Sequence, residues 1–485
     1  MGSESFGFED FLSVFTWRYG SKEMRRIFSE IHYREIWRKI WVALAEAQRE
    51  FGLVSDEEVR DLKSKMPREF IDLKRAHELE KKIKHDVMAE LKTYAEQCPV
   101  GGGKLHLGAT SMDITDNADI VRIQEAIEVL IDKILGCLQL FSEKIIEFKD
   151  LACMGWTHLQ PAEPTTLGYR LSNYAQDLTL DLLLLEYLTE KIVKGKGIKG
   201  AVGTSASFKR LLESGEAVSK LERIVMEKLN LGFFTVSSQT YPRKVDFIIL
   251  STLSSIAQSA HKFAFDIRIL QSPNFGELAE PIRAEQVGSS AMPFKRNPVK
   301  SERICSLARY VSALPSVAWW NASNTLLERT LDDSANRRII IPEAFLAVDE
   351  CLRLYYEVLD GLRVYPKMME KNLKNYGPFV GTEALLMKLT SRGMNRQVAH
   401  EKLRKYSFKA WEEVMVGKEN PLLKLLNQDP DISRLISQEE LEETLDPYSH
   451  VGNAPKRCEE FVHEVLEPIL KKYGKRPRMI QKSQF

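Results

Sequence analysis

The sequence predicts an all-α protein built around a central bundle of long helices. Apolar residues from Ile120 to Phe148 recur at spacings of three and four over about eight helical turns. Similar apolar stripes continue through residues 171–193, 245–270 and 333–362, whereas alternating strand patterns are rare. Helices of this length need partners along their whole length, which a bundle or an association of several chains supplies.

Local signals indicate where the helices start and stop. Thr115 or Asp116 is suited to cap the first long helix. Another helix is expected from about Val299 until Pro315, which should kink or interrupt it because proline lacks the backbone N–H. The run 197–208 is rich in glycine and is expected to hold a short strand or a turn.

The 485 residues are too many for one ordinary core, and the patterns divide them into three regions. Shorter helices are expected in residues 1–111, the long-helix bundle in residues 112–364, and shorter, more charged helices in residues 365–485. Turn residues at 427–430 and 446–447 break up the last region. We therefore expect three helical domains.

Composition limits the classes of partner. The chain is 44% hydrophobic and 28% charged, which is typical of a folded protein, and its net charge is only +1. No global field attracts nucleic acid or an anionic membrane, so a polyanionic ligand needs a local cluster of cations. The acidic N-terminus does not resemble a signal peptide, and no stretch of 18 residues is uncharged and apolar. A cytoplasmic protein without membrane or nucleic-acid partners is expected.

Cysteines and histidines give little support for a metal site. The six cysteines show no CxxC spacing, and the nine histidines show no HxxxH or HExxH spacing. Buried free thiols in a reducing compartment are the simpler interpretation. We expect neither a metal nor an organic cofactor.

The segment GSSAMPFKRNP, residues 288–298, has the composition of a mobile loop between two helices. It carries the hydroxyl of Ser289, the cation of Lys295 and the amide of Asn297. Asn297 followed by Pro298 is a favourable start for the next helix, whose N-terminus would attract an anion. A purely structural loop is the alternative.

This segment resembles the GSS-x-MP-x-K-x-NP motif of the fumarase/aspartase superfamily, with Phe294 where Tyr or His is common. The resemblance implies a three-domain helical fold and a tetrameric helical core. It also implies β-elimination of fumarate, with Ser289 as the base. Lys295 and Asn297 would stabilise the carboxylate dianion that develops in the transition state.

A second segment, GWTHLQPAEPTTLG at residues 155–168, contains the lone histidine His158. A lone histidine is more often structural or solvated than catalytic. The string nevertheless resembles the T-H-x-Q-x-A segment of the superfamily. That resemblance implies that His158 is the general acid, that Thr157 binds substrate, and that Glu302 is a candidate to orient the proton of His158.

A third segment, KLHLGATSMD at residues 104–113, places Thr110 and Ser111 before the first long helix, with His106 just upstream. A capping box or a turn would explain the two hydroxyls without any function. The segment also resembles a superfamily motif, which implies that Thr110 and Ser111 bind a substrate carboxylate and that His106 lies at the substrate.

Within the superfamily, two short strings resemble the animal-type adenylosuccinate lyases. Arg18–Tyr19 resembles a pair that reaches the nucleotide phosphate, although a surface turn would look similar. Lys84–His85–Asp86, expected on a helix, resembles the R-H-D-V segment, with Lys84 where many members have Arg. The resemblance implies that His85 binds and positions the substrate, and a satisfied surface histidine is the alternative.

The arginines of the second half strengthen this resemblance. Gln239, in a string similar to the family's Q-T-Y segment, is implied to contact substrate, although a polar loop is the alternative. Arg303, Arg329 and Arg338 lie near expected helix starts in apolar or turn-like contexts, where an unpaired guanidinium is costly. The resemblance assigns Arg329, Ser334 and Arg338 to the phosphate and ribose end, and Arg303 to a carboxylate.

Taken together, the resemblance implies a homotetramer whose active sites are each shared by three chains. The implied reactions release fumarate from adenylosuccinate to give AMP, and from the succinylaminoimidazole carboxamide ribotide (SAICAR) to give AICAR. Both belong to purine nucleotide biosynthesis. The alternatives are another fumarate-releasing lyase, such as argininosuccinate lyase or fumarase, and a non-catalytic structural homologue.

Overall fold

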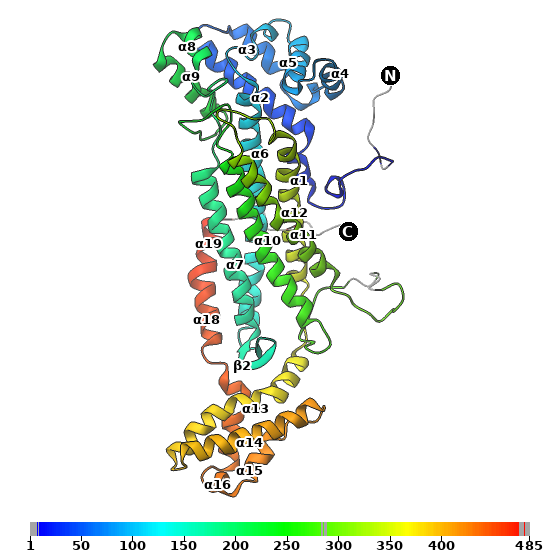
Figure 1. Cartoon of the computed structure of the whole chain (residues 1–485), viewed down its shortest axis with the longest axis vertical. Coiled ribbons are helices and arrows are strands. Elements are labelled where there is room, and N and C mark those ends of the chain that lie inside the picture. Colours follow the sequence, from blue (N-terminus) through cyan, green and yellow to red (C-terminus); the bar gives the residue numbers. More distant parts are fainter. Residues whose placement is uncertain (1–6, 8, 283–284, 286–288, 475–479, 481–485) are drawn as a thin grey trace.

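The computed structural model describes residues 7, 9–282, 285, 289–474 and 480, so Gly288 of the predicted loop lies outside the described residues. The chain forms an elongated rod, with shorter helices at both ends of a long bundle (Figure 1). The two strand pairs that the structure describes are short, which confirms the prediction of an all-α protein.

Five long helices make the central bundle, close to the ranges expected from the apolar stripes. Their bounds are α6 (Ser111–Glu147), α7 (Leu167–Tyr187), α10 (Lys244–Leu270), α11 (Val299–Ser323) and α12 (Ser334–Asp360). A five-residue π-helical turn, Leu188–Ile192, continues α7. The rings of Phe263 and Tyr355 stack in the bundle core with centroids 4.1 Å apart, and Phe141 contacts both rings edge-on.

Three of the expected helix boundaries are wrong. The first long helix begins at Ser111, where Thr110 and Asp113 form a capping box, so Thr115 and Asp116 lie inside the helix. Helix α11 starts after Pro298, so Asn297 is not its cap. Helix α11 also passes through Pro315, because one missing hydrogen bond is tolerated in a helix that packs closely along α10.

The N-terminal end of the rod consists of short helices that pack on α2 (Glu30–Arg49), which buries Trp37 and Trp41. Two helices from later in the chain, α8 (Ala206–Leu212) and α9 (Gly215–Lys228), lie at the same end, and α9 packs on α2 (Figure 1). The remaining elements at this end are α3 (Asp56–Ser64), η2 (Arg68–Phe70), α4 (Leu73–Ile83), α5 (Asp86–Gln97) and η3 (Gly102–Lys104). Two earlier elements, η1 (Val14–Thr16) and α1 (Lys22–Ile27), pack on the bundle instead, η1 on α12 and α1 mainly on α6 and α12.

The opposite end has a hydrophobic core of its own, contributed by residues between Leu385 and Leu445. Its elements are α13 (Pro366–Ser391), α14 (Arg396–Met415), α15 (Leu422–Asn427), α16 (Pro430–Ser433), α17 (Gln438–Leu445) and η5 (Pro447–His450). The chain then returns along α6 and α7 as α18 (Ala454–Phe461), η6 (Val462–Leu466) and α19 (Glu467–Lys472). The division into three domains at residues 111 and 364 stays a proposal. Helices α8 and α9 come from the middle region but lie at the N-terminal end, and α18 and α19 come from the last region but pack along the bundle.

The sequence did not reveal a β-hairpin around His158. Strands β1 (Ala152–Thr157) and β2 (Gln160–Thr166) pair antiparallel, and His158 and Leu159 form the two-residue turn with φ of +55° and +59°. Such turns usually contain Asn or Gly, because positive φ is costly for other residues. A second pair joins β3 (Leu278–Ala279) to β4 (Arg363–Val364). The run 197–208 holds turns and the start of α8 rather than a strand.

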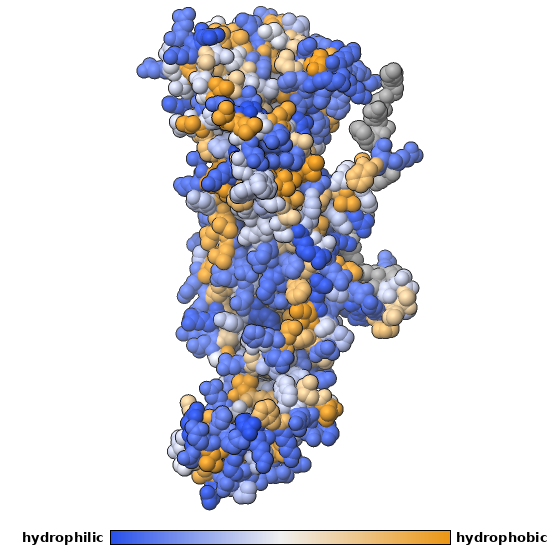
Figure 2. Space-filling model, viewed as in Figure 1, coloured by the Kyte–Doolittle hydropathy of each residue, from blue (hydrophilic) through white to orange (hydrophobic). Residues whose placement is uncertain are grey.

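The surface is mostly hydrophilic on the face shown in Figure 2, with apolar residues along the bundle. Helix α7 exposes about half of the side chains of Leu180 and Leu183. None of the described helices is both long enough and apolar enough to cross a membrane. All six cysteines are buried with free thiols, as the absence of CxxC spacing suggested.

Candidate active site

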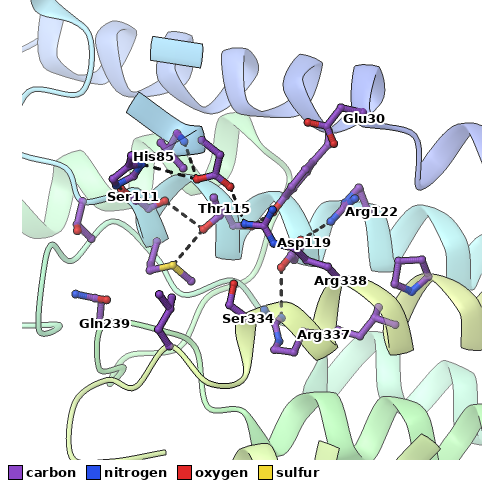
Figure 3. Close-up of a pocket in the computed structure, with 18 of the residues that line it drawn as sticks. Glu30, His85, Ser111, Thr115, Asp119, Arg122, Gln239, Ser334, Arg337 and Arg338 are labelled. Atoms are coloured by element: carbon purple, nitrogen blue, oxygen red, sulfur yellow. Dashed lines mark hydrogen bonds and ion pairs between the residues drawn. The ribbon is translucent and has the colours of Figure 1, made fainter. Parts of the chain in front are cut away.

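A cavity of about 640 Å³ opens near the N-terminal end of the bundle, where α6 begins (Figure 3). It lies between the α4–α5 junction, the start of α6 and the start of α12. Nine of the predicted site residues line it: Lys84, His85, Asp86, Thr110, Ser111, Gln239, Arg329, Ser334 and Arg338. Residues separated by about 250 positions in the sequence therefore share one cavity.

One wall of the cavity comes from the junction of α4 and α5. Lys84 ends α4 in the left-handed conformation, and His85 caps α5, so these residues do not lie within one helix as expected. The His85 Nδ1 atom accepts the N–H of Met88 at 3.3 Å, and its Nε2 atom lies 3.4 Å from the Ser111 hydroxyl. Because Nδ1 is an acceptor, Nε2 can carry a proton into the cavity.

Asp86 and Arg338 form an ion pair across the cavity wall, with 2.6 Å between the guanidinium and the carboxylate. Burial would raise the pKa of Asp86, but Arg338 and the N–H of Val87 bring this pKa below its usual value. Asp86 therefore stays ionised and holds the guanidinium in place, while about two thirds of the Arg338 side chain remains exposed. An anchored but accessible guanidinium is suited to bind an anion.

At the start of α6, the two hydroxyls differ in what they do. Thr110 belongs to the capping box of α6, which is the structural role that the sequence pattern indicated as the alternative to substrate binding. The Ser111 hydroxyl instead faces His85. His106 does not line the cavity, and its Nδ1 atom accepts the indole N–H of Trp41 at 3.1 Å. Burial lowers the pKa of His106, so this histidine is neutral and supports the wall from behind.

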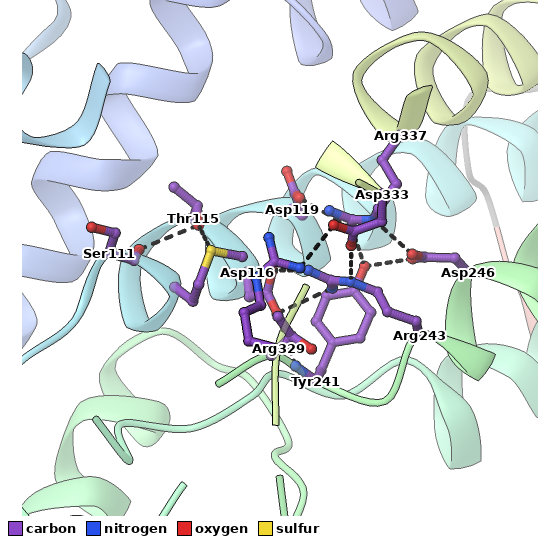
Figure 4. Close-up of polar contacts among 12 residues, drawn as sticks. Ser111, Thr115, Asp116, Asp119, Tyr241, Arg243, Asp246, Arg329, Asp333 and Arg337 are labelled. Carbon is purple, nitrogen blue, oxygen red and sulfur yellow. Dashed lines mark hydrogen bonds and ion pairs between the residues drawn. The ribbon is translucent and has the colours of Figure 1, made fainter. Parts of the chain in front are cut away.

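A buried network of charges lies beneath the cavity, and the sequence reasoning did not find it (Figure 4). The Arg243 guanidinium donates two hydrogen bonds to Asp116, at 3.0 and 3.1 Å, and one to Asp333 at 2.7 Å. Asp333 also accepts a 2.7 Å hydrogen bond from the cavity residue Arg329. Burial would raise the pKa of Asp333, but the neighbouring arginines bring this pKa below its usual value.

The second half of the network is centred on Arg337. Its guanidinium bonds Asp246 at 2.7 Å and the Tyr241 hydroxyl at 2.6 Å, and lies 3.3 Å from Asp119. Arg337 and Asp119 also line the cavity, although only the neighbouring Arg338 was predicted. A usable signal was present, since Asp116 and Asp119 recur at helical spacing on an apolar helix face, where they require buried cations.

Four predicted residues lie outside the cavity, two just before α1 and two near the start of α11. The guanidinium of Arg303 lies 5.8 Å from the ring centroid of Tyr19, and that of Arg18 lies 5.9 Å from the same centroid. The backbone after Tyr19 is fixed by Glu350, which accepts the N–H of Gly20 at 3.1 Å. Glu302 is exposed in the first turn of α11.

Thr157 and His158 occupy the tip of the β1–β2 hairpin, which lies at the other end of the bundle beside α13 (Figure 1). Arg170 supports the hairpin by donating to the Met154 carbonyl at 2.6 Å and by pairing with the buried Glu277 at 2.9 Å. Thr157 lines a separate open depression of about 780 Å³. Arg170 thus holds the middle of the hairpin, and the exposed tip lies far along the rod from the first cavity.

The described part of the predicted loop, residues 289–298, projects from the side of the rod before α11 (Figure 1). Ser289 is half-buried, and its hydroxyl oxygen accepts the N–H groups of Ala291 at 3.4 Å and Met292 at 3.1 Å. Of the described residues that line the first cavity, none is Ser289, Lys295, Asn297 or His158. A single chain therefore does not bring the predicted base, acid and cation cluster together.

Among the residues that the structure describes, no group of three or more His, Cys, Asp or Glu side chains is arranged to hold a metal ion. The cavity instead offers guanidinium groups, hydroxyls and an imidazole. This set of groups suits an anionic organic ligand with hydrogen-bonding atoms.

Comparison with known proteins gives the class to which this rod of long helices belongs. A family profile described as "Lyase" matches residues 23–312. The solved 3-carboxy-cis,cis-muconate lactonizing enzyme from Pseudomonas putida superposes with a TM-score of 0.82 at 24% identity, over 94% of this chain and 99% of that one. A fumarate lyase from Mesorhizobium superposes with a TM-score of 0.80, also at 24% identity, over 92% and 98% of the two chains.

Sequence comparison gives the particular family. A profile described as "Adenylosuccinate lyase C-terminus" matches residues 378–461. The chain is 42% identical to the adenylosuccinate lyase of Schistosoma mansoni and 40% identical to that of Saccharomyces cerevisiae, in each case over 96% of this chain and 97% of the relative. The chain belongs to the adenylosuccinate lyase family and is an enzyme of the lyase class.

Proposed function

We propose that this enzyme cleaves adenylosuccinate to AMP and fumarate, and SAICAR to AICAR and fumarate, in purine nucleotide biosynthesis. The observation that carries the proposal is the set of anchored cations and donors around the first cavity: Lys84, His85, Ser111, Gln239, Arg329, Ser334 and Arg338. A substrate with one phosphate and two carboxylates needs such a local cluster in a chain of net charge +1. The names of the relatives agree with this substrate class.

The cavity favours a nucleotide over a smaller dicarboxylate. Arg329 and Arg338 each have one carboxylate partner that fixes the guanidinium, namely Asp333 and Asp86. Preorganised guanidinium groups bind an anion without a large cost in side-chain entropy. With Ser334 at the start of α12, they form an expected site for the phosphate and ribose.

The proposed reaction is β-elimination of a C–N bond. Ser289 removes the proton beside one succinyl carboxylate, the electrons of that C–H bond form the C=C bond of fumarate, and those of the C–N bond leave with the nitrogen. His158 then protonates the departing nitrogen, with Glu302 as the candidate orienting group. The two N–H groups that point at the Ser289 oxygen support this assignment, because such donors stabilise the alkoxide.

The developing dianion needs stabilisation at the carboxylate beside the carbanion. Lys295 and Asn297, on the same segment as Ser289, are the proposed groups for this role. Thr110, Ser111 and Arg303 are proposed to bind substrate carboxylates, and Arg18 and Tyr19 to reach the phosphate. No metal or cofactor is needed in this scheme, because every charge that forms has a proposed protein partner.

A homotetramer with active sites shared by three chains is part of the proposal. It is supported by the distance along the rod between the first cavity and the His158 hairpin, which a neighbouring chain running in the opposite direction could bridge. It is also supported by exposed apolar side chains on long helices, such as Leu180, Leu183 and Trp320. We also propose a cytoplasmic location, in keeping with the six free thiols.

The test is to mix the purified protein with adenylosuccinate and quantify AMP and fumarate by chromatography. Ser289→Ala is the diagnostic variant, and Ser290→Ala is the matched control on the adjacent hydroxyl. Equal amounts of AMP and fumarate from the wild type and the control, with at least about a hundred-fold loss in Ser289→Ala, support the reaction and the base. Intact tetramers that release no fumarate would exclude this substrate and lead to argininosuccinate as the next trial.

A further inference from the structure

The segment that carries Ser289 and Lys295 leaves the bundle after β3 and rejoins it at α11. Its two ends meet at Glu280, the residue that follows β3. How this junction is built determines where the proposed base and cation can lie, so the inference below rests on the proposed function. We call Glu280, Gln271 and the backbone groups they bond the loop anchor.

Glu280 is fully buried, and its carboxylate lies on the N-terminus of α11. One carboxylate oxygen accepts the N–H of Lys300 at 3.0 Å. The other accepts both the N–H and the hydroxyl of Ser301, each at 2.9 Å. Helix α11 has no side-chain cap from the residue that precedes it, so Glu280 satisfies N–H groups that would otherwise be unpaired.

Burying a carboxylate here is costly, which argues that this contact is specific. Burial raises the pKa of Glu280, and the N–H groups of Lys300 and Ser301 oppose that increase. A fully buried acid is retained only where its hydrogen bonds are well formed. The same carboxylate links the end of β3 to the first turn of α11, the turn that also carries Glu302 and Arg303.

Gln271, at the end of α10, joins the two ends of the segment a second time. Its amide oxygen accepts the N–H of Glu280 at 3.0 Å, before the segment begins. Its amide nitrogen donates to the carbonyl of Arg296 at 2.9 Å, one residue after Lys295. A third link runs from the Lys300 ammonium to the carbonyl of Pro281 at 3.1 Å. The ends are thus fixed to each other and to α10.

We propose that Glu280 and Gln271 are positioning residues for the elimination. They contact no reacting atom, and they act by fixing both ends of the segment, so that Ser289 and Lys295 reach the substrate in one geometry. Reaction rates are sensitive to displacements of about 1 Å in such groups, which can cost about a hundred-fold. The first cavity is built from other elements, so binding of the nucleotide end should be insensitive to the anchor.

The first variant is Glu280→Gln, which keeps the shape but replaces one accepting oxygen with an N–H₂ group. That group would face an N–H donor of α11, so at least one hydrogen bond is lost. We expect kcat for fumarate release to fall about 10-fold or more, which corresponds to about 1.4 kcal/mol. The inhibition constant of AMP should change less than about two-fold, because the cavity proposed for the nucleotide end is built from other elements.

The second variant, Gln271→Met, removes both amide hydrogen bonds at a half-buried position and should fold even if Glu280→Gln does not. The matched control is Asp429→Asn. Asp429 is also a buried carboxylate that accepts two N–H groups at a helix start, but it lies in the core of the C-terminal end. Its substitution should lower the thermal midpoint without changing kcat per folded enzyme.

A readout independent of turnover is limited trypsin digestion of the intact protein after Lys295 and Arg296. Faster cleavage there in both anchor variants than in the wild type and in Asp429→Asn supports the anchor, even if adenylosuccinate proves to be the wrong substrate. Wild-type kcat and wild-type cleavage in both variants would overturn the proposal. A kcat that falls in Asp429→Asn as far as in Glu280→Gln would also overturn it, because the effect would then be general destabilisation.

Discussion

The buried network under the cavity gives the sharpest test of the structural reasoning, through the substitution Arg243→Met. This change removes the guanidinium that joins Asp116 and Asp333 but keeps most of the side-chain volume. Both carboxylates are almost completely buried, and Arg243 is only 3% exposed. Breaking a buried ion pair by removing one partner typically costs about 3–5 kcal/mol, and we expect a loss of that size in the free energy of unfolding.

The assay is urea unfolding at one fixed protein concentration, because assembly would otherwise shift the midpoint. Arg392→Met is the matched control. Arg392 also makes a two-bond contact with a carboxylate, that of Glu440, but this pair is more than one third exposed, so water and salt screen it and its loss should lower the stability far less. Adding Asp116→Asn to Arg243→Met should recover part of the loss, because an uncompensated charge is removed.

The same substitution should act on the enzyme as well. Asp333 holds Arg329 in the cavity wall, and without Arg243 one of the cations that position Asp333 is missing. The KM for the nucleotide substrate is therefore expected to rise. A loss of stability no greater than that of Arg392→Met would refute the view that the network is a strongly coupled, desolvated cluster.

Three further substitutions test separate features. Arg338→Met should raise the KM about 10–100-fold in steady-state kinetics by removing the guanidinium that Asp86 presents, and an unchanged KM would contradict an anion site. Burial raises the pKa of Asp181 to about 6, so its stabilising contribution is lost as pH rises through that value. Asp181→Asn should therefore raise the melting temperature at pH 8 but not at pH 4, and equal gains at both would contradict this pKa. Gly203→Ala should lower the melting temperature, because its Cβ would lie 1.9 Å from the Ser237 carbonyl at a φ of +82°, and an unchanged value would argue against this geometry.

The long helices could be predicted from the sequence because their apolar residues repeat with the helical period over many turns. Boundaries were less predictable. Thr110 and Asp113 compete for the cap with Thr115 and Asp116, and all four are favourable cap residues. Pro315 was expected to kink or interrupt α11, but the helix is not interrupted there, because tertiary packing along α10 outweighs one missing hydrogen bond.

The hairpin at His158 had no sequence signal that could reveal it. Neither His158 nor Leu159 is a typical residue for a two-residue turn with positive φ, and Pro161 and Pro164 discourage a strand. Positive φ in non-glycine residues is often found at functional positions, where the surrounding structure maintains it. At the hairpin, the surrounding structure thus overrides the backbone preference of His158, the residue proposed as the general acid.

The cavity residues could be found because they occur in short strings with recognisable composition. The network beneath them gave a weaker signal, the helical spacing of Asp116 and Asp119, because the partners Arg243 and Arg337 meet these carboxylates only when α6, α10 and α12 come together. Glu280 was missed for the same reason, since it caps a helix that begins 19 residues later. Side chains that act on other side chains are revealed by three-dimensional contacts rather than by motifs.

The six buried thiols give this protein a built-in set of reporters for local opening. One thiol follows α5, and the other five lie in α6, β1, α11, α12 and α18. Burial raises the pKa of each of these thiols, and that of Cys153 to about 11, so alkylating reagents should react with them only after the surrounding element opens. Mass spectrometry of timed alkylation would then order the segments of the rod by how often each one unfolds, without any label being introduced.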